Sequence, residues 1–236
     1  MTSRLEGRIA VITGASRGIG AAVARRFARE GAQLVLIART QGGLEEVDDA
    51  VRAEGGTATL VPLDLRDFEA LDRLGAALHE RHGKLDILVG NAGILGPLSP
   101  VGHIDPDRWQ QVMDINLTAN WRLIRSLDPL LRQSDAGRAI FVSSGVAGFT
   151  KPYWGAYAAS KAALEMMVQV YAAEVERITP VRANILDPGI VRTAMRAEAF
   201  PGEDPMSLPH PDDIADIFVD LADPACTRSG EVIRAN

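Results

Sequence analysis

The sequence predicts an α/β fold of the doubly wound type, with about seven parallel strands in one sheet and helices on both faces. Short apolar runs alternate with longer helical patterns along the whole chain. The apolar runs are nearly continuous, which is typical of parallel strands covered on both faces. The length of 236 residues suits one α/β domain, and no internal repeat or low-complexity linker divides the chain. We therefore expect a single domain over residues 1–236.

Each predicted strand is a short segment rich in apolar or β-branched residues. In chain order these segments are residues 8–13 (RIAVIT), 33–38 (QLVLIA), 57–62 (TATLVP), 85–90 (LDILVG), 138–143 (RAIFVS), 181–187 (VRANILD) and 231–234. Helical patterns fill the intervals, at about residues 18–30, 42–54, 67–82, 107–133, 155–177 and 211–222. A strand, a helix and a further parallel strand form a right-handed βαβ unit, and repetition of this unit builds a doubly wound sheet.

One segment, residues 193–213, lacks a clear period. It carries four prolines and follows the sixth predicted strand. A long segment of this kind is usually a lid or a partly disordered loop. Because it leaves the sheet at the carboxyl end of a strand, where open α/β sheets bind ligands, we favour a substrate lid.

Composition excludes several classes of protein. The formal net charge of −6 argues against non-specific nucleic-acid binding. Cys226 is the single cysteine, so an intrachain disulfide is impossible and a reducing compartment is expected. We see no apolar run typical of a signal peptide or a membrane span, and the four histidines are too scattered for a metal site. We expect a cytoplasmic protein that binds no metal.

A glycine-rich turn, TGASRGIG at residues 13–20, follows the first predicted strand. Glycine lets the backbone approach a pyrophosphate, and the N-terminus of the next helix offers free N–H groups and a positive dipole. The turn therefore predicts a dinucleotide site, although a turn that only connects strand and helix is the alternative. The residues expected to contact the nucleotide here are Gly14, Ser16, Arg17, Gly18, Ile19 and Gly20.

The end of the second strand indicates which dinucleotide binds. An acidic residue there would accept hydrogen bonds from the ribose 2′-hydroxyl, whereas an arginine would pair with a 2′-phosphate. Here the strand ends in Ala38-Arg39 without an acid, and Arg17 lies inside the glycine turn. Two guanidinium groups and no carboxylate favour NADP(H) over NAD(H); the alternative is a pair of solvated surface arginines.

Tyr157 and Lys161 lie four residues apart in a predicted helix and therefore share one of its faces. A lysine ammonium beside a phenol favours the phenolate and lowers the pKa of the tyrosine. A tyrosine tuned towards neutral pH can exchange a proton with a substrate oxygen. Beside a bound dinucleotide, the pair predicts hydride transfer to or from a carbonyl. A surface helix with a solvent-facing lysine is the alternative.

Five motifs, in this order along the chain, resemble those of the short-chain dehydrogenase/reductase family. They are TGASRGIG at 13–20, Asp64-Leu65 after the third strand, NAG at 91–93, the set Ser144/Tyr157/Lys161, and DPGIVRT at 187–193. The likeness covers residues 8–232 and is greatest to the shorter single-domain branch, within it to a bacterial subgroup without an established substrate. It implies a Rossmann-type fold and a dinucleotide-dependent oxidoreductase.

The resemblance implies further residues around the cofactor. They are Asp64 and Leu65 at the adenine, Asn91, Ala92 and Gly93 at the centre of the cleft, Tyr157 and Lys161 at the nicotinamide end, and Pro188, Gly189, Val191 and Thr193 at the nicotinamide carboxamide. One position departs from the family pattern, because Asp187 stands where many relatives carry a small residue.

The resemblance also implies four catalytic positions. Ser144 would hydrogen-bond the substrate oxygen, and Tyr157 would be the general acid or base. Lys161 would bond the nicotinamide ribose and lower the pKa of Tyr157, while Asn116 would kink its helix and hold a water of a proton relay. Ser143 competes with Ser144 at the same strand end, but the thirteen-residue offset from Tyr157 that the family shows selects Ser144.

These patterns together predict an NADP(H)-dependent oxidoreductase acting on a carbonyl or a secondary alcohol. One alternative is an epimerase or dehydratase on the same fold, which usually has a larger C-terminal substrate region. The other is a dinucleotide-sensing regulator without turnover, a class that tends to lose the Tyr–Lys pair. Residues 107–133 and 155–177 are apolar over more than one helix face, so we also expect a homodimer or homotetramer built on them.

Overall fold

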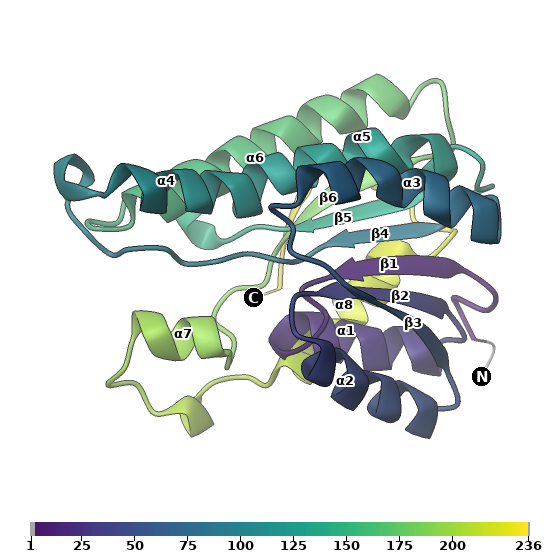
Figure 1. Ribbon diagram of the computed structural model, residues 1–236, viewed down its shortest axis with the longest axis horizontal. Coiled ribbons are helices and arrows are strands. Elements are labelled where there is room, and N and C mark those ends of the chain that lie inside the picture. The colour runs from purple at the N-terminus through teal and green to yellow at the C-terminus, as the bar shows by residue number, and fades with distance from the viewer. Residues whose placement is uncertain (1–2, 236) are drawn as a thin grey trace.

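The computed structural model describes residues 3–235 and contains one parallel sheet of seven strands (Figure 1). The strands are β1 (Ile9–Thr13), β2 (Gln33–Ala38), β3 (Thr57–Pro62), β4 (Ile87–Gly90), β5 (Arg138–Val142), β6 (Arg182–Asp187) and β7 (Val232–Arg234). Their order in the sheet is β3-β2-β1-β4-β5-β6-β7, and all neighbouring strands are parallel. Each strand lies within its predicted range, and the predicted doubly wound fold is confirmed.

Two helical layers cover the sheet, one on each face (Figure 1). One layer contains α1 (Gly18–Arg29), α2 (Gln41–Ala53) and α8 (Ala215–Ala222), and the other contains α3 (Phe68–His82), α5 (Ala119–Leu131) and α6 (Gly155–Val175). Each layer has its own apolar core, in which Phe27 and Phe218 pack on the first face and Phe141 and Leu123 on the second, all without solvent exposure. The sheet is therefore buried on both sides, as its continuous apolar strands require.

The strand order reverses beside β1, which pairs with β2 on one side and with β4 on the other. Ile12 near the end of β1 is aligned with Val89 near the end of β4. In doubly wound sheets, the loops that leave two such strands diverge to opposite faces and open a crevice at the carboxyl edge. The fold therefore places a ligand site between the ends of β1 and β4.

The predicted helix over residues 107–133 is interrupted. The chain forms α4 (Pro106–Met113), then a π-helical turn over Asp114–Thr118, then α5. Asn116 lies within the turn and is fully buried, and its side-chain amide exchanges two hydrogen bonds with the backbone of Ile94. A π-turn often marks a functional position in a helix. The expected kink at Asn116 is thus present as a change of helix type.

Residues 193–213 contain more structure than the sequence predicts. They form the short helix α7 (Ala194–Ala199) and two single 3₁₀ turns, Pro205–Ser207 and Pro211–Ile214. The Thr193 hydroxyl caps α7 by accepting a hydrogen bond from Arg196 N at 3.1 Å. Figure 1 shows α7 beyond the carboxyl edge of the sheet and outside both helical layers, which is where a lid would lie. The predicted helix at 211–222 is α-helical only from Ala215.

Candidate active site

A cleft with a volume of about 1,120 Å³ opens at the carboxyl edge of the sheet. Nearly every residue that the sequence singled out for the site lines it. They are Gly14, Ser16, Arg17, Gly18, Ile19, Arg39, Asp64, Leu65, Asn91, Ala92, Gly93, Ser144, Tyr157, Lys161, Pro188, Gly189, Val191 and Thr193. The exceptions, Gly20 and Asn116, lie buried directly behind the lining. The structure thus brings together residues that are up to 179 positions apart, from Gly14 to Thr193.

The glycine turn is closed tightly against the end of β4. Gly14 has a φ of +65°, and a Cβ there would lie 2.9 Å from Ala92 Cα. A Cβ on Gly20 would collide with the carbonyl oxygen of Gly14. Thr13 Oγ1 holds the two strand ends together by accepting hydrogen bonds from Asn91 N at 3.0 Å and Ala92 N at 3.1 Å. The turn therefore leaves no room for a side chain at Gly14 or Gly20, while Gly14 and Gly18 line the cleft with backbone alone, an arrangement that suits the pyrophosphate of a dinucleotide.

Two arginines frame the adenosine end of the cleft. Arg17 and Arg39 are exposed and line it, one from the glycine turn and the other from the end of β2. The nearby Asp64 is already engaged, because Arg66 Nη2 donates to its Oδ2 at 2.7 Å and holds the pKa of the carboxyl below its usual value. An anionic group bound beside Arg17 and Arg39 would contact two guanidinium groups. Strand β2 carries no carboxylate that would repel this group.

Tyr157 and Lys161 lie on the buried face of α6, with exposed fractions of 7% and 3%. Lys161 Nζ donates to the carbonyl oxygen of Val142, the last residue of β5, at 2.7 Å, and lies 5.8 Å from the centre of the Tyr157 ring. The i,i+4 spacing therefore places both side chains at the same strand end, as predicted. The alternative of a surface helix is wrong.

Burial raises the pKa of Tyr157 to about 12; a hydrogen bond with Ser144 opposes this shift, and the charge of Asp187 adds to it. Burial also lowers the pKa of Lys161 to about 8, partly offset by Glu165. The expected net lowering of the Tyr157 pKa is therefore wrong for the protein itself, and the effect of Lys161 on it stays a prediction. The physical reason is that loss of hydration penalises both charged forms, the phenolate and the ammonium.

The two candidate serines at the end of β5 have different surroundings. The Ser143 hydroxyl is buried and donates to Glu165 Oε1 at 2.6 Å. Ser144 lines the cleft beside Tyr157 and lowers the pKa of its phenol, which opposes the effect of burial. A substrate oxygen could therefore reach Ser144 and Tyr157 together, whereas Ser143 is occupied by Glu165.

Asn116 sits behind Gly93, opposite Lys161. A Cβ on Gly93 would lie 3.3 Å from Asn116 Oδ1 and 3.5 Å from Lys161 Nζ. The side-chain amide of Asn116 also donates to Ser160 Oγ at 3.0 Å, and the backbone carbonyl of Asn116 accepts from Asn120 Nδ2 at 2.9 Å. These bonds fix the π-turn beside the lysine; the role in a proton relay stays a prediction.

Asp187, the position that departs from the family pattern, is buried below the cleft and does not line it. Its Oδ1 accepts from Gly189 N at 3.1 Å, and Oδ2 lies 3.9 Å from Arg234 Nε. The carboxylate thus shapes the turn that carries Pro188 and Gly189, and its charge contributes to keeping Tyr157 protonated.

Sequence reasoning did not single out several individual residues of the cleft wall. Ile94, Leu95, Met195, Arg196 and Ala199 also line the cleft. The last three come from α7, in the segment predicted as a lid, and an amphipathic period over six residues is too short to detect.

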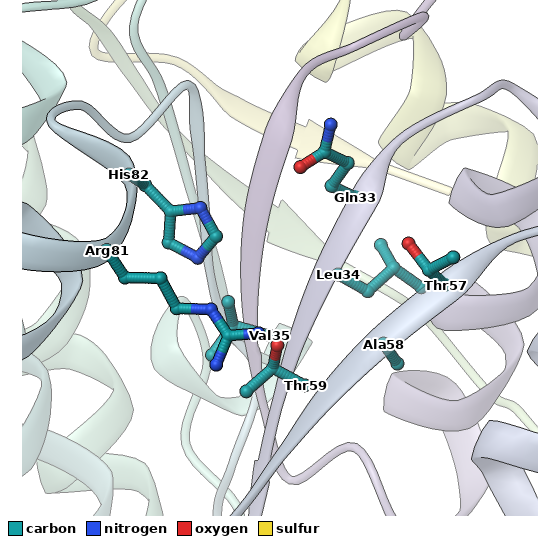
Figure 2. A pocket seen from close by; sticks show the side chains of 8 residues that line it. All are labelled: Gln33, Leu34, Val35, Thr57, Ala58, Thr59, Arg81 and His82. Carbon is teal, nitrogen blue, oxygen red and sulfur yellow. The ribbon is translucent and has the colours of Figure 1, made fainter.

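A second, much smaller cavity of about 140 Å³ lies at the other edge of the sheet (Figure 2). Gln33 and Thr57, the first residues of β2 and β3, line it together with Arg81 and His82 at the end of α3. No predicted site residue contacts it. Within residues 3–235, no cluster of acidic, histidine or cysteine side chains could hold a metal ion, and no helix could span a membrane.

The fold and the cleft define a dinucleotide-binding protein with a serine, a tyrosine and a lysine at one strand end. A family model described as short chain dehydrogenase matches residues 8–204, and the chain belongs to that family. It is 40% identical over 218 residues to an uncharacterized oxidoreductase, YciK, of Escherichia coli K12, covering 91% of this chain and 86% of that protein.

Two further comparisons concern the nucleotide. A short chain dehydrogenase of Escherichia coli CFT073, solved in complex with NADPH, superimposes with a TM-score of 0.94 at 38% identity, covering 100% of this chain and 99% of that one. A relative from Mycobacterium tuberculosis CDC 1551, 34% identical and covering 92% of this chain and 90% of that protein, is named an uncharacterized NAD-dependent oxidoreductase. The chain is thus an oxidoreductase of the short-chain dehydrogenase family.

Proposed function

We propose that the protein is an NADP(H)-dependent oxidoreductase that interconverts a carbonyl and a secondary alcohol. The observation that carries the proposal is the meeting of Ser144, Tyr157 and Lys161 at the end of β5, in the same cleft as the glycine turn. The nucleotide, when bound, supplies or accepts the hydride. Ser144 orients the substrate oxygen, and Tyr157 Oη donates the proton that this oxygen needs on reduction.

The protonation state of Tyr157 suits the proton donor that the reduction direction requires. With a pKa of about 12, the phenol carries its proton throughout the neutral range and is ready to act as an acid. Lys161 holds the β5 end through Val142 and offers its remaining protons to the cleft, where the ribose hydroxyls are expected. Turnover of NADPH with a panel of aldehydes and ketones tests the proposal and separates it from a dinucleotide-sensing protein without turnover.

The choice of NADP(H) rests on Arg17 and Arg39. Both are exposed in the cleft, and β2 ends without a carboxylate. The relative solved with NADPH supports this choice, whereas the relative named NAD-dependent shows that the family contains both. A guanidinium and a phosphate form a charge-assisted, often bidentate pair, which a ribose hydroxyl cannot replace.

Arg39→Asp is expected to shift the ratio of the NADPH and NADH dissociation constants by ten- to a hundredfold towards NADH, since charge-assisted hydrogen bonds contribute about 1.5–3 kcal/mol each. Fluorescence titration with each nucleotide measures this ratio. Arg177→Asp changes an exposed arginine of the same charge outside the cleft and serves as the control. Equal affinity of the wild type for NADH and NADPH would contradict the proposal that Arg17 and Arg39 select NADP(H).

We propose a homo-oligomer that pairs through α5 and α6. Trp121, Met166 and Val170 are 46%, 62% and 49% exposed on these helices. On the same helices, Leu123, Leu127 and Tyr171 are buried in the apolar core, and Ile124 and Met167 are partly buried against it. An exposed apolar patch on two adjacent long helices suits a two-fold interface.

Light scattering is expected to give at least twice the 25.3 kDa mass of the chain. Met166→Glu combined with Val170→Glu should shift the protein towards the monomer, because two carboxylates would lose their hydration in the contact. Met206→Glu, which changes an exposed apolar side chain of the turn Pro205–Ser207 outside α5 and α6, should not cause this shift. A wild type that stays monomeric at micromolar concentration with full activity would exclude the interface.

A further inference from the structure

One lysine ammonium lies against two neighbouring aromatic rings, Trp154 and Phe200, whose centres are 5.9 Å apart at the edge of the cleft. Lys151 Nζ lies 4.2 Å from the centre of the Trp154 ring and 4.3 Å from the centre of the Phe200 ring. Trp154 precedes α6, and Phe200 follows α7. Two cation–π contacts hold the ammonium in place, whereas an ordinary surface lysine keeps its charged head in water.

This ammonium lies close to the reacting groups. The Trp154 ring lines the cleft and packs edge-on against Tyr157, with the ring centres 5.9 Å apart and the planes at 74°. Lys151 therefore lies only one aromatic ring away from Tyr157. A substrate whose carbonyl oxygen meets Tyr157 would extend its far end along Trp154 towards Lys151.

The positive charge at this point is not balanced. Arg196 also stacks on Phe200, with its guanidinium carbon 3.7 Å from the ring centre, but both Nε and Nη2 of Arg196 are bonded to Glu203 at 2.6 Å. Across residues 3–235, Lys151 has no acidic partner: burial and the charge of Arg196 lower its pKa, and no carboxylate raises it. Of the two cations that share the Phe200 ring, only Arg196 is thus paired with a carboxylate.

The loop that carries Lys151 is held in an unfavourable backbone conformation. Tyr153 has a φ of +72°, which lies in the left-handed region. Between residues 3 and 235, no other non-glycine residue has a positive φ. Its carbonyl accepts a hydrogen bond from Ser99 N at 3.0 Å, and Ser99 also pairs with Trp154. Strain of this kind persists where surrounding contacts impose it, and it concentrates at ligand-binding positions.

We propose that Lys151 determines specificity by binding an anionic group, a carboxylate or a phosphate, at the end of the substrate remote from its carbonyl. The inference rests on the proposed reductase function and names its substrate class: anionic aldehydes or ketones with a flat or apolar spacer that lies along Trp154. An anion there gains a charge-assisted hydrogen bond from Lys151 and relieves its repulsion with Arg196.

The test uses three aldehydes that differ in one group: 4-carboxybenzaldehyde, 4-formylphenyl phosphate and the neutral methyl 4-formylbenzoate. For each anionic aldehyde that the enzyme reduces, Lys151→Met is expected to raise the KM about tenfold, because one charge-assisted contact with the substrate is lost. The kcat should change little. The KM of the ester should not change. Lys151→Arg retains the cation and should keep the low KM. The two anions show which acidic group the site prefers.

A second readout separates this inference from the proposed function. Isothermal titration of the wild type and of Lys151→Met, each saturated with NADP⁺, measures binding of the dianion benzene-1,4-dicarboxylate and of its neutral dimethyl ester without any turnover. Tighter binding of the dianion that is lost in Lys151→Met supports the anion site, even if no aldehyde is reduced. If none of the three aldehydes is reduced, the result counts against the proposed reductase function and not against the anion site.

Three results would overturn the proposal. Equal affinity of the wild type for the dianion and the ester would show that the ammonium does not face the ligand. An equal rise in the KM of charged and neutral aldehydes in Lys151→Met would assign Lys151 a packing role beside Trp154. A raised dissociation constant for NADPH in the same variant would show that its charge serves the nucleotide instead.

Discussion

Tyr157→Phe is expected to lower kcat by about 10²- to 10⁴-fold, the usual contribution of a positioned general acid. The substitution removes only the hydroxyl, and the ring keeps its edge-on contact with Trp154. The dissociation constant for NADPH should therefore stay nearly the same. Steady-state kinetics on any reduced carbonyl, with a parallel nucleotide titration, measures both effects.

Tyr171→Phe is the matched control for this change. Tyr171 also lies on α6, and its hydroxyl hydrogen-bonds Asp128 rather than lining the cleft. Its removal should lower stability and leave kcat nearly unchanged, because the hydroxyl bonds Asp128 and does not reach the cleft. Normal turnover by Tyr157→Phe would refute the acid–base role of Tyr157.

Lys161→Ala is expected to weaken NADPH binding and to lower kcat, each by about tenfold or more, as loss of a charge-assisted contact implies. The ammonium bonds Val142 at the end of β5, so its loss leaves that buried carbonyl without a partner and empties the space beside Asn116. Stability should fall by about 1–3 kcal/mol for the same reason. Urea denaturation, nucleotide titration and steady-state kinetics report the three effects.

Lys161→Met separates charge from packing, because methionine fills most of the space of the lysine stem. It should recover part of the stability but neither the affinity nor the rate. Recovery of turnover in Lys161→Met would mean that the lysine acts only as a filler, and the proposed contact with the nucleotide would then be excluded.

The strands and the cleft could be predicted from sequence because their signals are local. Continuous apolar runs define β1 to β6. The chain needs glycine directly after β1, because a Cβ at Gly14 would collide with Ala92. Topology then brings Ser144, Tyr157 and Lys161 to the same edge as the turn. In these elements, local pattern and global fold agree.

The parts that were not predicted depend on tertiary contacts. The π-turn at Asp114–Thr118 is expected only as a kink at Asn116 that the family resemblance implies, because the bonds from Asn116 to Ile94, 22 residues earlier, leave no trace in the helical period. The pKa of Tyr157 depends on how deeply α6 is buried against β5, so the sequence suggested the opposite direction. Lys151 was overlooked, because its two ring partners come from segments that meet only in the fold.

The central claim is that this cleft transfers a hydride between NADP(H) and a carbonyl carbon. The most direct measurement is the loss of NADPH absorbance at steady state with a panel of aldehydes and ketones, for the wild type and Tyr157→Phe side by side, with the alcohol product identified. We predict NADPH-dependent formation of the alcohol by the wild type, at least 10²-fold slower in Tyr157→Phe. Tight NADPH binding without consumption on any carbonyl, or equal rates for the two proteins, would contradict the claim.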